Sequence, residues 1–167
     1  MSGIAVYPGS FDPIHQGHLD LIERCRSIFD QVVVAVLENE EKKPLFSVAE
    51  RMEMIRELVG GDGFCRVESF SGLLVEFMDS MGAGVIVRGL RAISDFEYEF
   101  QMALMNRHLN ARVETVFLMP KEEYSYLSSR LVKEVYRLGG NLEGLVPPTV
   151  LARMSRRLRG ESGRAGS

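Results

Sequence analysis

Residues 3–18 read GIAVYPGSFDPIHQGH, and this stretch decides the fold. A short apolar run, Gly3–Tyr7, ends at Pro8-Gly9 and is followed by a turn and a helical pattern from about Gly17 to Phe29. A strand, a loop and a helix in this order form the first part of a βαβ unit. The sequence therefore predicts that its first strand belongs to a parallel sheet.

The rest of the chain repeats this alternation of strands and helices. Further strand patterns cover Gln31–Leu37, Arg66–Phe70, Gly84–Val87 and Val113–Met119. Two helical patterns follow capping boxes: one begins at Ser47 and runs to Val59, and the other begins at Ser94 and runs through about Leu109. Three more helical patterns cover about Leu73–Met81, Ser128–Leu138 and the residues after Pro147-Pro148. Continuous apolar runs such as VVVAV and VIV are typical of parallel strands buried on both faces.

These patterns predict an α/β fold: a single Rossmann-like domain with a five-stranded parallel sheet and helices on both faces. We expect this domain to cover residues 1–159. Residues 160–167 (GESGRAGS) offer nothing to bury, so we expect a disordered tail there.

Composition excludes several classes of protein. The 167 residues suit one domain with a full hydrophobic core, and the net charge of −3 argues against a nucleic-acid binder. Two cysteines, Cys25 and Cys65, are too few for a disulfide framework, and no run approaches the roughly 18 apolar residues of a membrane span. Met1–Tyr7 lacks the features of a signal peptide. We expect a cytoplasmic protein that binds neither nucleic acid nor membranes.

The turn after the first strand carries groups suited to an anion. Ser10 supplies a hydroxyl, Gly17 leaves room for a close approach, and His18 begins a helix, where the amides and the dipole favour negative charge. A zinc pair of His15 and His18 is the alternative, but only one further histidine, His108, and no cysteine cluster could complete it.

Two arginines leave the end of the fourth predicted strand in the stretch RGLRAISDFEYE, residues 88–99. An arginine that ends an apolar VIV run needs a counter-anion, and phosphate suits the guanidinium fork of Arg88 or Arg91. The alternative is an internal salt bridge with Asp95 or Glu97.

The remaining loops are less informative by themselves. Glu38–Pro44 reads as a mixed-charge surface loop, and Leu74 reads as a core residue. Ser128 and Ser129 open a helix, where serines usually serve as caps.

Taken together, the motifs resemble a known superfamily. The HxGH motif after an N-terminal strand is similar to that of the nucleotidyltransferases, in which it holds the triphosphate of ATP. YPGSFDPIHQGH and RGLRAISDFEYE resemble the phosphopantetheine adenylyltransferase branch, and the resemblance runs from Gly3 to about Pro147. A relative that uses nicotinamide mononucleotide or CTP, a non-catalytic nucleotide or coenzyme A sensor, and a tRNA-handling module are the competing interpretations.

The resemblance implies transfer of the adenylyl group of ATP to 4′-phosphopantetheine, which gives dephospho-coenzyme A and pyrophosphate. It implies catalytic roles for His18, Lys42, Arg91 and Ser129. It implies phosphopantetheine contacts for Ser10, Lys42, Leu74 and Arg88. It implies ATP contacts for Ser10, Phe11, His18, Gly89, Leu90, Arg91, Glu99, Tyr124, Ser125, Tyr126, Leu127, Ser128, Ser129 and Arg130.

The resemblance also implies partners. Mg²⁺ would be bound through the ATP phosphates, with no dedicated protein ligands. Coenzyme A would act as a feedback inhibitor, and the chain would form a homohexamer. Two positions depart from the family pattern: Ser10 stands where many relatives have threonine, and Arg130 where a third serine is common.

Overall fold

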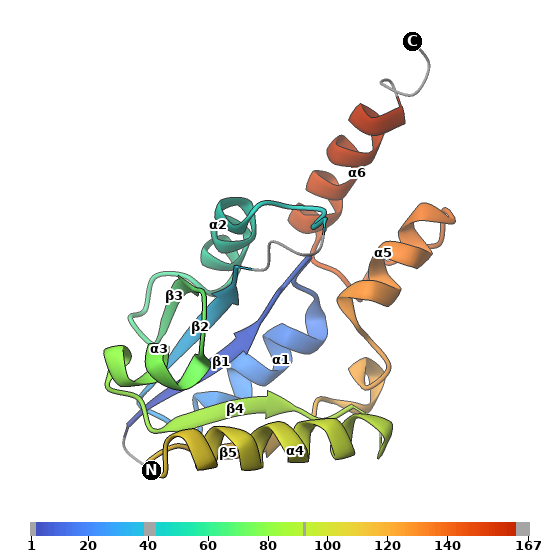
Figure 1. Cartoon of the computed structure of the whole chain (residues 1–167). Coiled ribbons are helices and arrows are strands. Elements are labelled where there is room, and N and C mark those ends of the chain that lie inside the picture. Colours follow the sequence, from blue (N-terminus) through green and yellow to red (C-terminus); the bar gives the residue numbers. More distant parts are fainter. Residues whose placement is uncertain (1–2, 39–42, 92, 163–167) are drawn as a thin grey trace.

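The structure, a computed structural model, describes residues 3–38, 43–91 and 93–162. Within these residues the chain forms one parallel sheet of five strands in the order β3-β2-β1-β4-β5 (Figure 1). The strands are β1 Ile4–Gly9, β2 Gln31–Leu37, β3 Cys65–Phe70, β4 Val85–Gly89 and β5 Glu114–Leu118. The predicted α/β fold with a five-stranded parallel sheet is confirmed.

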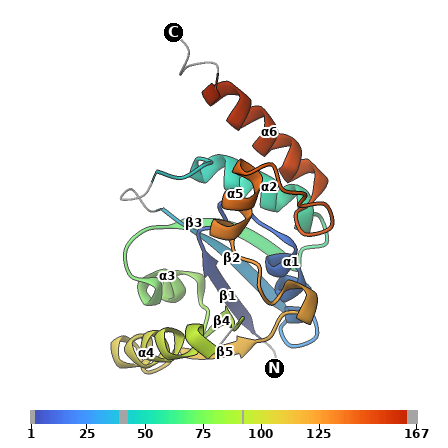
Figure 2. The same ribbon diagram turned by 90° about the vertical axis from the view of Figure 1, so that its right-hand side faces the viewer.

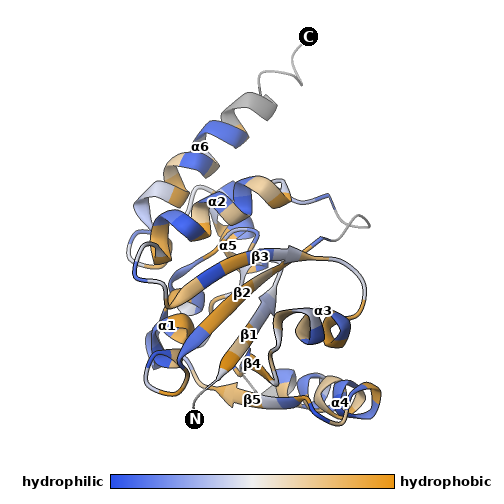
Figure 3. Ribbon diagram, turned by 90° about the vertical axis from the view of Figure 1, so that its left-hand side faces the viewer, coloured by the Kyte–Doolittle hydropathy of each residue, from blue (hydrophilic) through white to orange (hydrophobic). Residues whose placement is uncertain are grey.

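Helices cover both faces of the sheet, as Figures 2 and 3 show for α1 and α2 on one side and α3 and α4 on the other. The helices are α1 Gln16–Cys25, α2 Val48–Val59, α3 Leu74–Met81, α4 Ile93–Leu109, α5 Ser129–Arg137 and α6 Pro148–Ser162, and a short 3-10 turn covers Glu122–Tyr124. Side chains alternate along each strand. In β1, Ala5 and Tyr7 pack into the core beneath α1 and α2, whereas Val6 packs into the core beneath α3.

The strand order reverses direction between β1 and β4. The chain first moves outward from β1 through β2 to β3 and then returns to place β4 on the other side of β1. Both strands end in glycine, at Gly9 and Gly89. A β-carbon on Gly89 would lie 2.5 Å from Cδ1 of Leu21 in α1. Glycine therefore lets α1 approach the end of β4, where open α/β sheets bind their ligands.

Several boundaries differ from those expected. Helix α1 ends at Cys25, because the amides of Ile28 and Phe29 turn back onto the carbonyl of Cys25; Phe29 is still buried. Helix α4 begins at Ile93, so Ser94 lies in its first turn and is not its N-cap. Within the described ranges, no helix has the length and apolar content that a membrane crossing requires.

The C-terminal helix is longer than expected. Helix α6 continues to Ser162, past the predicted tail boundary at residue 160, since a helix already begun gains a hydrogen bond with each added residue. Residues 163–167 lie outside the described residues, and disorder there remains a prediction.

Candidate active site

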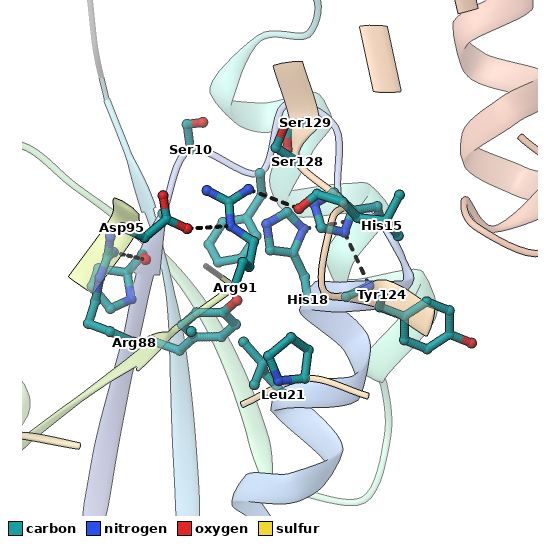
Figure 4. A pocket seen from close by; sticks show the side chains of 18 of the residues that line it. Ser10, His15, His18, Leu21, Arg88, Arg91, Asp95, Tyr124, Ser128 and Ser129 are labelled. Atoms are coloured by element: carbon teal, nitrogen blue, oxygen red, sulfur yellow. Dashed lines mark hydrogen bonds and ion pairs between the residues drawn. The ribbon is translucent and has the colours of Figure 1, made fainter. Parts of the chain in front are cut away.

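A cavity of about 500 Å³ lies at the carboxyl ends of β1 and β4. Loops after β1, β4 and β5 contribute to its wall together with the first turns of α1 and α5. Figure 4 shows His18 and Arg91 facing the same space, with Ser10, Ser128 and Ser129 at one end and Leu21 at the other. The cavity thus has a polar end beside a partly apolar one.

Two histidines form the start of α1. Nδ1 of His15 accepts a hydrogen bond from the amide of Gly17 at 3.1 Å, and Nδ1 of His18 accepts one from the amide of His15 at 3.2 Å. Their rings stack with centroids 3.7 Å apart. Because Nδ1 of His18 accepts, its Nε2 carries the proton of the neutral ring and is the available donor.

The surroundings keep both rings neutral. Burial lowers the pKa of His18 well below its ordinary value, and His15, Arg91 and Arg88 lower it further. Burial also lowers the pKa of His15 to about 3, with a further contribution from Arg91. His18 is therefore a neutral hydrogen-bond donor, and the positive charge of the cavity comes from the arginines.

Arg91 joins two of the loops around the cavity. Its Nη1 donates to the carbonyl of Leu127 at 2.9 Å, and its Nε lies 3.2 Å from Oδ2 of Asp95. The predicted alternative of an internal salt bridge with Asp95 is thus present for this arginine. At the surface such a pair contributes about 1 kcal/mol or less, so the guanidinium can exchange partners when an anion arrives.

Arg88 is held more firmly. Its Nε and Nη2 donate to the two carboxylate oxygens of Glu99 at 2.7 and 2.5 Å, and its Nη1 donates to the carbonyl of Pro8 at 3.0 Å. Glu99, expected to contact the nucleotide, lines the cavity but is the ion-pair partner of Arg88. This bidentate pair fixes the guanidinium plane and leaves hydrogens on Nη1 and Nη2 for a further acceptor.

The start of α5 faces the polar end of the cavity. Ser128 is the N-cap, and its hydroxyl oxygen accepts from the amide of Leu131, so the hydroxyl proton remains free to donate. The hydroxyl of Ser129 donates to the carbonyl of Pro13 at 2.8 Å. Among the described residues, no acceptor bonds to the amides of Ser129 and Arg130, which is the usual condition of an anion-binding helix start.

A second cavity of about 370 Å³ adjoins the first. Its wall is mostly apolar and comes from the start of α3 and one side of α4. Both cavities are lined by Pro8, Gly9, Arg88, Tyr98 and Glu99. Arg88 therefore stands at the junction of a polar cavity and an apolar one.

Most of the predicted site residues meet at these cavities. The first cavity brings together Ser10, Phe11, His18, Arg88, Gly89, Arg91, Glu99, Tyr124, Leu127, Ser128 and Ser129. Leu74 lines the second cavity. Leu90, Ser125, Tyr126 and Arg130 line neither, and Arg130 is exposed. Lys42 lies outside the described residues.

Sequence reasoning missed a polar cluster beneath the site, formed by Asp12, Arg51 and Lys133. Asp12 is 4% exposed and accepts hydrogen bonds from the amides of Leu45 and Phe46, each at 2.9 Å. Nζ of Lys133 in α5 lies 3.1 Å from Oδ2 of Asp12. A signal was available for Arg51, because it occupies the core-facing stripe of α2 together with Met54 and Ile55.

Among the described residues, no group of three or more histidine, cysteine or acidic side chains could hold a metal ion. The two stacked histidines use their Nδ1 atoms on backbone amides. This arrangement differs from the zinc pair considered as an alternative.

A cavity of about 500 Å³ lined by two arginines at the switch point of a parallel sheet is typical of a nucleotide-binding α/β protein. A family model described as cytidylyltransferase-like matches residues 6–135, so the chain belongs to this family of nucleotidyltransferases. A lipopolysaccharide core biosynthesis protein from Thermoplasma volcanium shares the fold, with a TM-score of 0.55, 23% identity, and coverage of 70% of this chain and 96% of its own.

Relatives with much higher identity narrow the family. Phosphopantetheine adenylyltransferases from Heliobacterium modesticaldum, Geotalea daltonii and Anaeromyxobacter dehalogenans are 59%, 57% and 52% identical to this chain. The matches cover 91%, 88% and 95% of this chain and 90%, 91% and 96% of theirs. The chain belongs to the phosphopantetheine adenylyltransferases, and the resemblance drawn from its motifs is confirmed.

Proposed function

We propose that this chain transfers the adenylyl group of ATP to 4′-phosphopantetheine, giving dephospho-coenzyme A and pyrophosphate. The observation that carries the proposal is the pair of joined cavities, with Arg88 at their junction. One cavity suits a nucleoside triphosphate and the other an uncharged, partly apolar arm that ends in a phosphate. Relatives above 50% identity carry the name of this enzyme.

In the proposed reaction a phosphate oxygen of the acceptor attacks the α-phosphorus of ATP. The bond from this phosphorus to the oxygen that bridges it to the β-phosphate breaks, and pyrophosphate leaves with the electron pair. The nucleophile is already an anion, so the protein needs no covalent intermediate. Catalysis then consists of aligning two anions and stabilising charge as it moves to the leaving group.

The nucleotide groups have matching donors in the first cavity. Nε2–H of His18 suits an oxygen of the transferring phosphate, because a neutral donor can strengthen its bond as charge develops. Arg91 and the start of α5 suit the leaving pyrophosphate. There we assign the contacts to the hydroxyl of Ser128 and the amide of Ser129, since the Ser129 hydroxyl already donates to Pro13.

The acceptor occupies the junction and the second cavity in this proposal. Arg88, fixed by Glu99, would bind the phosphate of 4′-phosphopantetheine through the hydrogens that the ion pair leaves free. The arm would extend past Leu74 along the apolar wall. Ser10 and Lys42 retain the roles that the family resemblance implies, beside the reacting phosphates.

We infer that magnesium enters bound to the triphosphate. The carboxylates of Asp95 and Glu99 line the cavity, and both are paired with arginines, so they form no cage of their own. This fits Mg²⁺, which commonly keeps several waters and binds substrate phosphates with few protein ligands. When bound, the ion would neutralise part of the phosphate charge.

We further infer a homohexamer, feedback by coenzyme A and a cytoplasmic location. An exposed apolar face on α4 supports assembly, and the two thiols, Cys25 and Cys65, are unpaired, as expected in a reducing compartment. Coenzyme A contains the same arm and adenylyl group as the product and would therefore compete for both cavities.

A substrate panel tests the proposed function. The chain is incubated with magnesium and ATP or CTP, together with 4′-phosphopantetheine, nicotinamide mononucleotide or an alcohol phosphate, and released pyrophosphate is measured. We expect release only with ATP and 4′-phosphopantetheine. Turnover with another pair would assign a different acceptor, and ATP binding without turnover in any mixture would favour a sensor.

A further inference from the structure

Asp12 and Lys133 form an ion pair that no proposed catalytic role uses. Nζ of Lys133 lies 3.1 Å from Oδ2 of Asp12; the carboxylate is buried, and the lysine side chain is 25% exposed. Lys133 lines neither of the two cavities, so it touches no substrate in the proposed arrangement. Burial of a charge is costly even when it is paired. The position of this pair therefore calls for a reason.

The carboxylate of Asp12 is also held by two groups other than Lys133. Its Oδ2 accepts a hydrogen bond from the amide of Leu45 and its Oδ1 accepts one from the amide of Phe46, each at 2.9 Å. Hydrogen bonds from backbone amides to a carboxylate are charge-assisted and strong, and two of them fix the plane of the carboxylate. Asp12 therefore gives α5 a fixed point of attachment in the loop after β1.

Helix α5 meets the loop after β1 at two points. The hydroxyl of Ser129 donates to the carbonyl of Pro13 at 2.8 Å, and Lys133 pairs with Asp12. Ser129 and Lys133 are four residues apart, so they lie on the same face of the helix and about 6 Å apart along its axis. Val132 is fully buried between them, but apolar packing is not directional. A helix attached at one polar contact can pivot there, whereas a second contact one turn away fixes the direction of its axis.

The direction of α5 matters because its start carries the donors assigned to the leaving pyrophosphate. These donors are the hydroxyl of Ser128 and the amide of Ser129, and Figure 4 shows both serines at one end of the first cavity. The free amides of a helix start point along the helix axis. A small rotation of α5 would therefore change the distance between these donors and the phosphate oxygens.

We infer that Lys133 is a positioning residue: through its ion pair with Asp12 it directs the start of α5 at the leaving pyrophosphate of ATP. The inference rests on the proposed function. Loss of the pair should weaken the binding of a ligand that carries the β- and γ-phosphates. Dephospho-coenzyme A has the same adenylyl group but lacks the leaving pyrophosphate, so its affinity should not depend on the pair.

Lys133→Met tests the inference, because methionine is also unbranched but carries no charge. We expect the Kd for ATP, measured by calorimetry, to rise roughly 10-fold, as for the loss of about one hydrogen bond to a charged group. The value of kcat/KM for ATP should fall roughly 10- to 100-fold, the scale of a misplacement of up to about 1 Å. The Kd for dephospho-coenzyme A should stay within about 2-fold of the wild-type value. Unchanged ATP affinity, or equal losses for both ligands, would overturn the inference.

Arg137→Met is the matched control. Arg137 lies on the same helix, one turn beyond Lys133, and is exposed. The substitution removes the same charge from α5 and leaves the pair of Lys133 and Asp12 in place. We expect Arg137→Met to keep both the Kd for ATP and kcat. A similar loss in both variants would show that any positive charge removed from α5 weakens ATP binding, which contradicts a specific role for Lys133.

A double-mutant cycle separates positioning from a direct attraction between the ammonium group and the phosphates. Asp12→Asn has nearly the same shape as the wild-type side chain and removes the charge that binds Lys133. If Lys133 acts through Asp12, Lys133→Met should cost about 3-fold or less in ATP affinity in the Asp12→Asn background, against roughly 10-fold alone. Equal costs in both backgrounds would mean that the ammonium acts on the phosphates by itself, and would overturn the inference.

Two further comparisons complete the test. If Lys133→Met fails to fold, Lys133→Gln takes its place under the same criteria, because glutamine keeps N–H donors and lacks the charge. A wild-type chain that makes no dephospho-coenzyme A refutes the proposed function. A wild-type chain that makes it, beside an unimpaired Lys133→Met, refutes only the role of Lys133.

Discussion

At the scale of single residues, the chemistry depends on a histidine that stays uncharged. The backbone amide of His15 occupies Nδ1 of His18, and burial with two nearby arginines disfavours protonation. The ring therefore presents one N–H, always at Nε2, to the cavity. An imidazolium would bring more charge, but neutrality keeps the bond weak in the ground state and lets it strengthen as negative charge develops.

The first prediction concerns His18 and pH. Since His18 works in its neutral form, kcat should not fall between pH 6.5 and about pH 8 through deprotonation of a histidine. His18→Ala should lower kcat roughly 100-fold or more, the scale of one lost transition-state donor. A pH–rate profile and steady-state kinetics measure both, with His108→Ala on the exposed part of α4 as the control. A rate that falls with a midpoint near pH 7, or near-normal turnover of His18→Ala, would contradict this role.

The second prediction concerns stability at low pH. The pKa of His15 is about 3 in the folded chain, below its ordinary value of 6.5, so between these values only the unfolded chain binds the proton. The stability that His15 contributes is complete above pH 6.5 and is lost as the pH falls, at about 1.4 kcal/mol per pH unit. His15→Asn keeps an N-cap acceptor and should reduce this slope by about one proton. Urea unfolding at pH 4–7 measures how the free energy of unfolding changes with pH. An unchanged slope in His15→Asn, or a reduced slope in His108→Asn, would contradict this contribution of His15.

Single-residue roles were the part of the site that the sequence predicted least well. Motif position indicated that His18, Arg88 and Arg91 would meet at one cavity. It did not indicate that Glu99 would hold Arg88, because that pair joins a strand end to the second turn of a helix. Hydrogen-bond partners depend on side-chain directions in three dimensions, which a linear pattern does not contain.

At the scale of elements, α6 is attached to α2 by two different kinds of contact. Arg153 forms ion pairs with Glu53 and Glu57, and Arg157 pairs with Glu50 and lies over the ring of Phe46. Beneath these pairs Met154 is fully buried. The acidic side chains of α2 attract the arginine-rich helix α6, and the burial of Met154 stabilises α6 in this position.

The third prediction compares these two kinds of contact. Met154→Ala should cost roughly 2–5 kcal/mol of unfolding free energy, as expected when a large core side chain is truncated. Arg153→Ala should cost about 1 kcal/mol or less, because the side chains of its partners Glu53 and Glu57 are 60% and 43% exposed and therefore screened by solvent. Chemical denaturation of both variants gives the comparison. A larger cost for Arg153→Ala than for Met154→Ala would show that the ion pairs hold α6 in place.

Elements were predicted well wherever local signals agreed. The valine-rich run at Gln31–Leu37 and the capping box of Ser47 and Glu50 gave the boundaries of β2 and α2 as observed. The end of α1 was placed too late, because Ile28 and Phe29 keep the helical spacing of apolar residues while the chain turns. Burial fixes which residues face the core, but a turn can satisfy it as well as a helix can.

At the scale of the whole molecule, α4 presents an apolar surface that the described chain leaves uncovered. Large apolar side chains at least 40% exposed follow it along its length: Phe96, Tyr98, Phe100, Met102, Leu104, Met105 and Leu109. Exposed apolar surface of this kind commonly marks a protein–protein contact. This surface supports the proposed hexamer.

The fourth prediction concerns this surface. The wild-type chain should sediment as an assembly of about six times its 18.8 kDa mass. Leu104→Glu places a charge on α4 away from both cavities and should shift the distribution to smaller species. Leu138→Glu alters an even more exposed leucine, outside α4, and should leave assembly unchanged. A monomeric wild-type chain, or equal dissociation of both variants, would remove the support for the hexamer.

The central claim is that the adenylyl group moves from ATP onto the phosphate of 4′-phosphopantetheine in these joined cavities. Tracing labelled ATP tests it most directly, in the presence of magnesium and the acceptor. With label at the α-phosphate, we predict that dephospho-coenzyme A carries the label and pyrophosphate does not. With label at the γ-phosphate, pyrophosphate should carry all of it. Product without the α-label, or an acceptor that gains the γ-label, would contradict the account.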